Sequence, residues 1–109
     1  MGNNCYLCPM KSIQTIRETI RLQRASPDNA IYLLVQGAFY HAYNEGAEHL
    51  HAVMGYQLRV RDDYKFLGFP ISSLDCVLDK LHAFYDGNRH ISVDASRYPH
   101  LVIKMKIIQ

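Results

Sequence analysis

The chain has 109 residues, the size of one ordinary domain, and a second independent core would be hard to fit, so we predict a single domain over residues 1–109. Its 49% apolar and 20% charged residues are typical of a globular protein and exclude a disordered tail. The net charge of +2 is compatible with nucleic acid but smaller than the excess that dedicated DNA-binding proteins show.

The first half of the chain predicts a helix, two extended segments and a second helix. Apolar residues recur at helical spacing over Pro9–Ala25. The continuous apolar run Ala30–Val35 is typical of a strand at the centre of a sheet, covered on both faces. The segment Phe39–Tyr43 continues with extended or edge character. Asn44 resembles an N-cap for the next helix, which Gly55 closes.

The second half predicts strand pairs on either side of a third helix. Residues 61–64 form a plausible hairpin turn, and the helix Leu74–Tyr85 begins at a capping box of Ser72 and Asp75 and ends at Gly87. Four segments are predicted as strands: Tyr56–Val60, Lys65–Phe69, His90–Val93 and Leu101–Ile108. This order predicts an α/β fold, a mixed β-sheet of about six strands flanked by about three helices.

The motifs of common enzyme classes are missing from the sequence. It contains no phosphate-binding P-loop, no dinucleotide-binding glycine pattern and no nucleophile elbow. The carboxylates Asp62 and Asp63 lie near Lys65, as a metal nuclease needs, but they occupy a predicted turn. His49 and His51 point to different faces of a helix. We therefore expect no enzymatic activity and no cofactor.

A metal site and a membrane location are also not predicted. Cys5 and Cys8 form a CxxC pair, but no second ligand pair follows at the spacing of a structural zinc site. No apolar run reaches the roughly 18–20 residues that span a bilayer. The N-terminus lacks the basic and apolar regions of a signal peptide. We expect a cytoplasmic protein without a membrane partner.

Six segments carry a resemblance to a known family, in this order: Cys8-Pro9-Met10, Ala30–Val35, Gly37-Ala38-Phe39-Tyr40, Leu58-Arg59-Val60-Arg61, Gly68-Phe69-Pro70 and Leu78-Asp79-Lys80-Leu81. MutS mismatch-repair proteins open with a Thr-Pro-Met helix, an apolar strand and a Gly-Asp-Phe-Tyr-Glu motif. Segments like Leu-Thr-x-Arg, Ala-Gly-x-Pro and Tyr-Leu-x-Lys-Leu follow. The chain therefore resembles the N-terminal mismatch-recognition domain (domain I) of that family, as a stand-alone domain.

The resemblance implies binding to double-stranded DNA at mispaired or flexible sites. Phe39 matches the family's phenylalanine, which enters from the minor groove and stacks on the mispaired base. His41 stands where the family has a base-binding glutamate. A cationic histidine would attract phosphates where a glutamate repels them, so we expect stronger general affinity and weaker mismatch discrimination. Arg59 and Arg61 complete the predicted DNA-binding set.

Each of these residues also has a structural interpretation. Phe39 could be a core aromatic beneath a helix, and His41 a surface residue on an edge strand. Arg17, Arg21 and Arg24 are interpreted as a solvated helix face, with phosphate contact as the alternative.

Three functions remain open. The first is a DNA-binding module, which at this size buries about 600–1,000 Å² on DNA and binds weakly unless it acts as an oligomer or as an accessory to another protein. The second is a protein-interaction module that keeps the fold without binding DNA and uses its eight tyrosines at an interface. The third is a metal nuclease.

Overall fold

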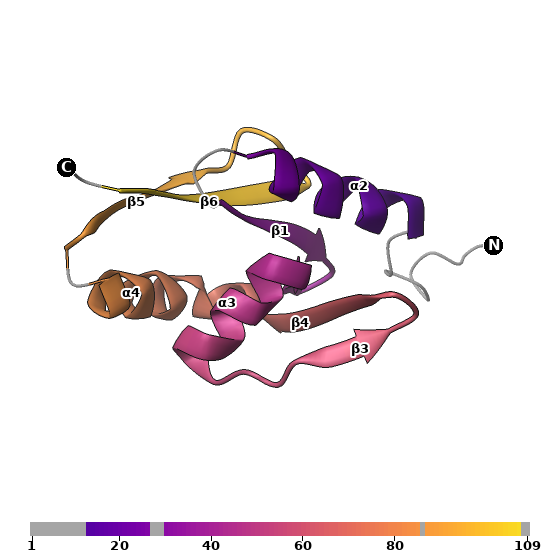
Figure 1. The fold of residues 1–109 in the computed structure, drawn as a ribbon, viewed down its shortest axis with the longest axis horizontal. Helices are drawn as coiled ribbons and strands as arrows, with labels where there is room; N and C mark the ends of the chain where they lie inside the picture. The colour runs from indigo at the N-terminus through magenta and orange to yellow at the C-terminus, as the bar shows by residue number, and fades with distance from the viewer. Residues whose placement is uncertain (1–12, 27–29, 86, 108–109) are drawn as a thin grey trace.

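Six strands form one sheet, and three α-helices pack on it within the part of the chain that the structure describes (Figure 1). The computed structural model describes residues 13–26, 30–85 and 87–107. The helices are α2 (Ile13–Ala25), α3 (Asn44–Met54), α4 (Leu74–Tyr85) and the 3-10 helix η1 (Ile71–Ser73). The strands are β1 (Ile31–Gln36), β2 (Phe39–Tyr43), β3 (Arg59–Arg61), β4 (Tyr64–Pro70), β5 (Arg89–Asp94) and β6 (His100–Ile107). The predicted α/β class and its six strands are confirmed.

Every strand pair between described residues is antiparallel, so the prediction of a mixed sheet is wrong. The strand order is β3-β4-β2-β1-β6-β5. Helix α3 connects β2 to β3, and α4 connects β4 to β5. Each helix therefore joins two strands that run in the same direction. These strands are not neighbours, because β4 lies between the first pair and three strands lie between the second. A helical connection predicts a parallel neighbour only when the two strands it joins become adjacent.

Strand β1 lies at the centre of the sheet, as predicted, and Leu33 and Leu34 are fully buried on its two faces. Strand β2 lies between β1 and β4, so the predicted edge character of Phe39–Tyr43 is wrong. Both sides of its backbone take part in the ladder, which leaves β3 and β5 as the edges.

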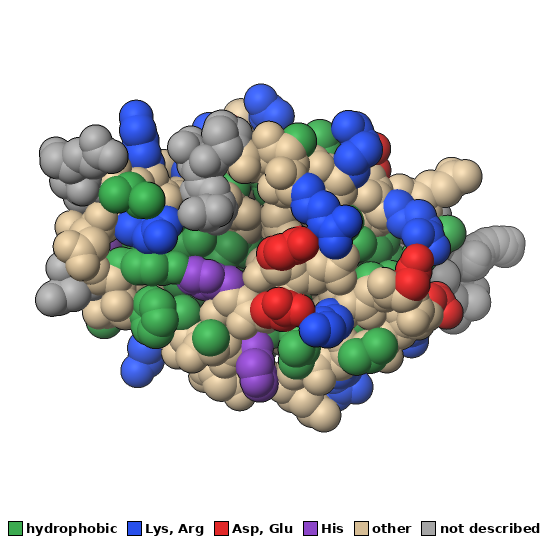
Figure 2. Space-filling model, in the orientation of Figure 1, with side chains coloured by type: hydrophobic (Ala, Val, Ile, Leu, Met, Phe, Trp, Pro, Cys, Tyr) green, Lys and Arg blue, Asp and Glu red, His purple; other side chains and the backbone are tan. Residues whose placement is uncertain are grey.

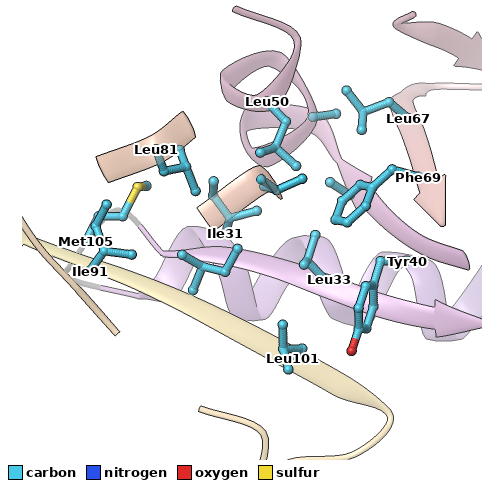
Figure 3. Close-up of a cluster of buried hydrophobic side chains, with 14 residues drawn as sticks. Ile31, Leu33, Tyr40, Leu50, Leu67, Phe69, Leu81, Ile91, Leu101 and Met105 are labelled. Atoms are coloured by element: carbon cyan, nitrogen blue, oxygen red, sulfur yellow. The ribbon is translucent and has the colours of Figure 1, made fainter. Parts of the chain in front are cut away.

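Helices α3 and α4 cover one face of the sheet, and α2 covers part of the other, so that β1 lies between α2 and α3 (Figure 1). On the α3/α4 face, Leu50 and Leu81 pack onto strand side chains that include Ile31, Leu33 and Phe69 (Figure 3). Burying each such leucine contributes about 1.5–3 kcal/mol relative to leaving it in water. On the α2 face, a second cluster joins Ile16, Leu34, Tyr43 and Tyr64.

The start of α3 differs from its prediction. The cap position is Tyr43, and no side chain caps the helix. Asn44 instead has φ 47°, and its Oδ1 accepts a hydrogen bond from the backbone N–H of Lys65 at 2.9 Å. Asparagine tolerates this left-handed backbone conformation. Its side-chain oxygen takes the place of the backbone carbonyl that a neighbouring strand would offer to β4. At the other end, Gly55 closes the helix as predicted, with φ 77°.

Other boundaries shift by a few residues. The β3–β4 turn contains only Asp62 and Asp63, because Arg61 and Tyr64 already pair. Ser72 lies inside η1, so it does not occupy the predicted capping position. The described part of the first helix begins at Ile13, and the predicted helix start at Pro9 lies outside the described residues, as do Cys5 and Cys8. None of the described helices is both long and apolar enough to cross a bilayer.

Candidate nucleic-acid interface

Phe39 stands at the tip of the β1–β2 hairpin. Gly37 and Ala38 form the two-residue turn, and Gly37 has φ 62°, a conformation that favours glycine. Phe39 pairs with Pro70 of β4, and the Ala38 carbonyl accepts a hydrogen bond from the N–H of Ile71 at 2.9 Å. The Phe39 side chain is nevertheless 47% exposed. The interpretation of Phe39 as a core aromatic is therefore wrong.

Successive residues of β2 alternate between the two faces of the sheet. Tyr40 and Ala42 are buried in the core on the α3/α4 face, where the Tyr40 ring lies 5.8 Å from that of Phe69. Phe39 and His41 therefore lie on the α2 face. The aromatic residue that fills the core at this point of the chain is Tyr40.

Arg59 and Arg61 lie on the same face. Phe66 of β4 is paired with Arg59 on one side and with Tyr43 of β2 on the other. Directly paired residues of an antiparallel ladder point to the same face, and so do alternate residues of one strand. The structure thus brings all four predicted residues to one face. We call this surface the open face, and it consists of Phe39, His41, Arg59, Arg61 and Phe66.

The two arginines of the open face are exposed cations. Neither Arg59 nor Arg61 forms an ion pair with any residue that the structure describes. The guanidinium carbon of Arg61 lies 5.9 Å from the centre of the Phe66 ring, within range of a cation–π interaction. Strand β3 therefore presents positive charge that no carboxylate of the described residues neutralises.

The three arginines of α2 are different. Each is exposed and paired with a carboxylate: Arg17 with Asp63 at 3.0 Å, Arg24 with Glu45 at 3.1 Å, and Arg21 with Glu18. Figure 2 shows basic side chains spread over the visible face, with carboxylates between them, and no single basic patch. These contacts agree with a solvated helix face, because a carboxylate already offsets the charge of each arginine.

His41 is half-buried on an interior strand, so its interpretation as a surface residue on an edge strand is wrong. Its ring lies 6.0 Å from that of Phe66 and 6.4 Å from that of Tyr43. A Cβ built at Gly68, its partner on β4, would lie 2.6 Å from the ring, so the imidazole packs directly over this glycine. Burial lowers the pKa of His41, which favours the neutral form over the cation expected from the sequence.

The other candidates for chemistry are dispersed. Within the described residues, no three His, Cys, Asp or Glu side chains are placed to hold a metal ion. Lys65, which belongs to the candidate nuclease site, forms an ion pair with Glu48 at 2.7 Å. His49 contacts the Tyr85 hydroxyl, whereas His51 hydrogen-bonds the carbonyl of Tyr56.

The tyrosines do not form one surface. Four of the eight are buried, namely Tyr32, Tyr40, Tyr43 and Tyr64. Tyr98 is the most exposed of those that the structure describes. An interface built from all the tyrosines together would therefore require the core to open.

Two residues of the site were missed at the sequence level. Phe66 and Gly68 lie on β4 at alternate positions that bring them beside His41. The alternation of the Lys65–Phe69 segment was visible in the sequence, but the pairing of β4 with β2 was not. No model of a known protein family matches the chain, and neither does any curated protein.

Proposed function

We propose that the protein is a non-catalytic, double-stranded DNA-binding module of the MutS domain I type, in which Phe39 enters the minor groove at mismatched or distorted sites. The observation that supports this most is a half-exposed phenylalanine at the tip of a hairpin that is hydrogen-bonded on both sides. An apolar wedge between base steps costs a few kcal/mol of unstacking, and a mismatched step is already weakened.

The position of Phe39 favours insertion over simple exposure. The hairpin is anchored through Pro70 and through the hydrogen bond between Ala38 and Ile71, so the backbone that carries the ring loses little conformational freedom on binding. Stacking of a base on an aromatic ring is worth about 1–3 kcal/mol. An exposed ring on an anchored backbone can realise much of that energy.

Arg59 and Arg61 supply the phosphate contacts. Strand geometry places them about 16 Å and 22 Å from Phe39, since two strand spacings of about 4.8 Å and four or six residue steps of about 3.3 Å separate them along the ladder. These distances correspond to about five or six base-pair steps of B-DNA. The arginines therefore reach phosphates flanking the distorted site, while Phe39 occupies it.

His41 contributes a neutral ring beside the wedge. Residues two apart on a strand are separated by about 6.6 Å, close enough for Phe39 and His41 to reach neighbouring bases. Neither ring nitrogen of His41 has a hydrogen-bond partner among the described residues, so the imidazole can donate to or accept from a base edge. Its neutrality leaves the general attraction for DNA to the arginines.

The test compares binding of the full chain to matched and mismatched duplexes at low salt by fluorescence anisotropy. We expect tighter binding to the mismatch, and a loss of about five- to a hundredfold in Phe39→Ala. Phe84→Ala is the control, because Phe84 is also exposed but lies on α4, at the other face of the sheet. Equal loss in both variants would contradict the wedge. No binding to either duplex would favour the protein-interaction module.

A second measurement isolates the phosphate contacts. Arg59→Gln and Arg61→Gln should each weaken binding to both duplexes and lower the slope of log affinity against log salt by about one. Arg17→Gln is the matched control, because Arg17 is already paired with Asp63. An unchanged salt slope in the two β3 variants would remove these arginines from the interface.

A further inference from the structure

A pocket of about 400 Å³ lies at the end of β1 opposite Phe39. It opens to solvent and is lined by the end of α2, the first turns of α3, the end of α4 and the start of β5. Ala30 and Ile31 form part of its apolar wall, and the polar side chains that line it include Arg24, His49 and Arg89. Its volume is within the range of about 300–1,000 Å³ found for small-molecule sites.

Arg89 is the least usual group in this pocket. It is the one arginine of the described residues that is not exposed. Its guanidinium carbon lies 4.6 Å from the centre of the Tyr85 ring, and Nη1 donates a hydrogen bond to the Met105 carbonyl at 3.3 Å. No carboxylate in the described chain pairs with it. Among the residues that the structure describes, no carboxylate compensates this half-buried cation, and its remaining N–H donors have no acceptor.

The rest of the pocket adds hydrogen-bonding groups. Arg24 donates through Nε to Glu45 at 3.1 Å, and its terminal nitrogens have no partner among the described residues. The His49 ring stacks on Tyr85, with ring centres 5.5 Å apart. Burial, followed by the charge of Arg89, lowers the pKa of His49, so this ring is a neutral hydrogen-bonding group near pH 7. Of the described residues that line the pocket, two are arginines, Arg24 and Arg89, and one is a carboxylate, Glu45.

We propose that this pocket binds the oxyanion group of a small molecule, a phosphate or a carboxylate, with Arg89 as its main contact and Arg24 at the rim. The planar guanidinium matches both groups in a two-point geometry, and its fixed position on Tyr85 reduces the ordering required on binding. The apolar wall accommodates the organic part of the ligand. This site is independent of the proposed DNA binding, because Arg89 lies on the α3/α4 face and Phe39 on the α2 face.

The test titrates the full chain with three probes at constant ionic strength: inorganic phosphate, adenosine monophosphate and acetate. Binding is followed through the ring signals of His49 in NMR spectra. Of the described residues, the charged and titratable groups that line the pocket together with that ring are Arg24, Glu45, Tyr85 and Arg89. We expect saturable shifts and a raised pKa of His49 in the complex. Saturation by the phosphate probes alone assigns a phosphate ligand, and saturation by acetate alone assigns a carboxylate.

Variants decide whether Arg89 is responsible. Arg89→Gln should weaken binding at least about tenfold, the loss expected from a hydrogen bond to a charged group. Arg97→Gln, an exposed arginine outside the pocket, should leave binding unchanged. Should Arg89→Gln fail to fold, Arg24→Gln at the exposed rim should still weaken binding severalfold. Absence of saturation with every probe, or equal weakening by Arg97→Gln, would overturn the proposal.

Discussion

A methyl group at Gly68 tests how firmly His41 is held on the open face. The added Cβ of Gly68→Ala would lie 2.6 Å from Cδ2 and 2.8 Å from Nε2 of His41, nearly 1 Å inside ordinary van der Waals contact. The rings of Phe66 and Tyr43, with centres 6.0 Å and 6.4 Å from that of His41, restrict sideways movement of the imidazole. It must swing toward solvent or separate the strands. Overpacking of this kind costs about 1–3 kcal/mol.

A double-mutant cycle measured by urea unfolding separates this clash from other effects. His41→Ala removes the ring, so Gly68→Ala should cost at least about 1 kcal/mol less in that background than in the parent. Gly55→Ala is the control, because Gly55 has φ 77° and an added Cβ there meets nothing within 4 Å. Its cost, about 1–2 kcal/mol of backbone strain, should be the same in both backgrounds. An equal cost of Gly68→Ala with and without the His41 ring would refute the packing described for the open face.

Three further substitutions test the fold around the site. Leu50→Ala, at a fully buried position between α3 and the sheet, should lower the free energy of unfolding by about 2–5 kcal/mol in urea. Asn44→Gly keeps the left-handed backbone but loses the hydrogen bond to Lys65, so it should lower the free energy of unfolding by about 1 kcal/mol. Asn44→Ala also strains that backbone and should lower it by about 1–2 kcal/mol more. The two variants should show successively lower Tm values. Burial lowers the pKa of His41 and His49 below 6.5, so the unfolded chain binds more protons than the folded chain in weak acid. The free energy of unfolding should therefore fall as the pH drops from about 7 to 5. His41→Gln should make the accompanying decrease in the denaturation midpoint smaller.

Local patterns explain why most elements could be predicted. The apolar run of β1 has no polar face, so only a central strand could accommodate it, and α4 repeats apolar residues at helical spacing from Leu74 to Tyr85. Gly55 is typical of a helix end because few other residues adopt its backbone conformation. These predictions depend on neighbours within a few residues of each other.

The remaining errors concern contacts between distant segments. Whether β2 lies at an edge depends on β4, which is more than twenty residues further along the chain. The same pairing explains why the Asn44 side chain does not cap α3, since it accepts a hydrogen bond from the Lys65 N–H instead. It also determines the surroundings of His41, which the sequence predicts as an exposed cation and which the structure shows as a half-buried ring with a lowered pKa. No local period in the sequence contains this information, because a strand pair is specified by both partners together.

The two proposed sites lie at opposite ends of β1, and this separation has a measurable consequence. The strand advances about 3.3 Å per residue, so the five steps from Ile31 to Gln36 place the pocket about 17 Å from the hairpin that carries Phe39. Effects of substitutions more than about 7–10 Å apart usually add. Phe39→Ala should therefore leave the affinity for phosphate unchanged, and Arg89→Gln should leave the affinity for mismatched duplex unchanged. In Phe39→Ala/Arg89→Gln each affinity should equal that of the relevant single variant. Two results together would contradict the existence of two separate sites. These are competition between duplex and inorganic phosphate at constant ionic strength, and loss of both affinities in Arg89→Gln. Arg89 would then be a contact for the DNA backbone.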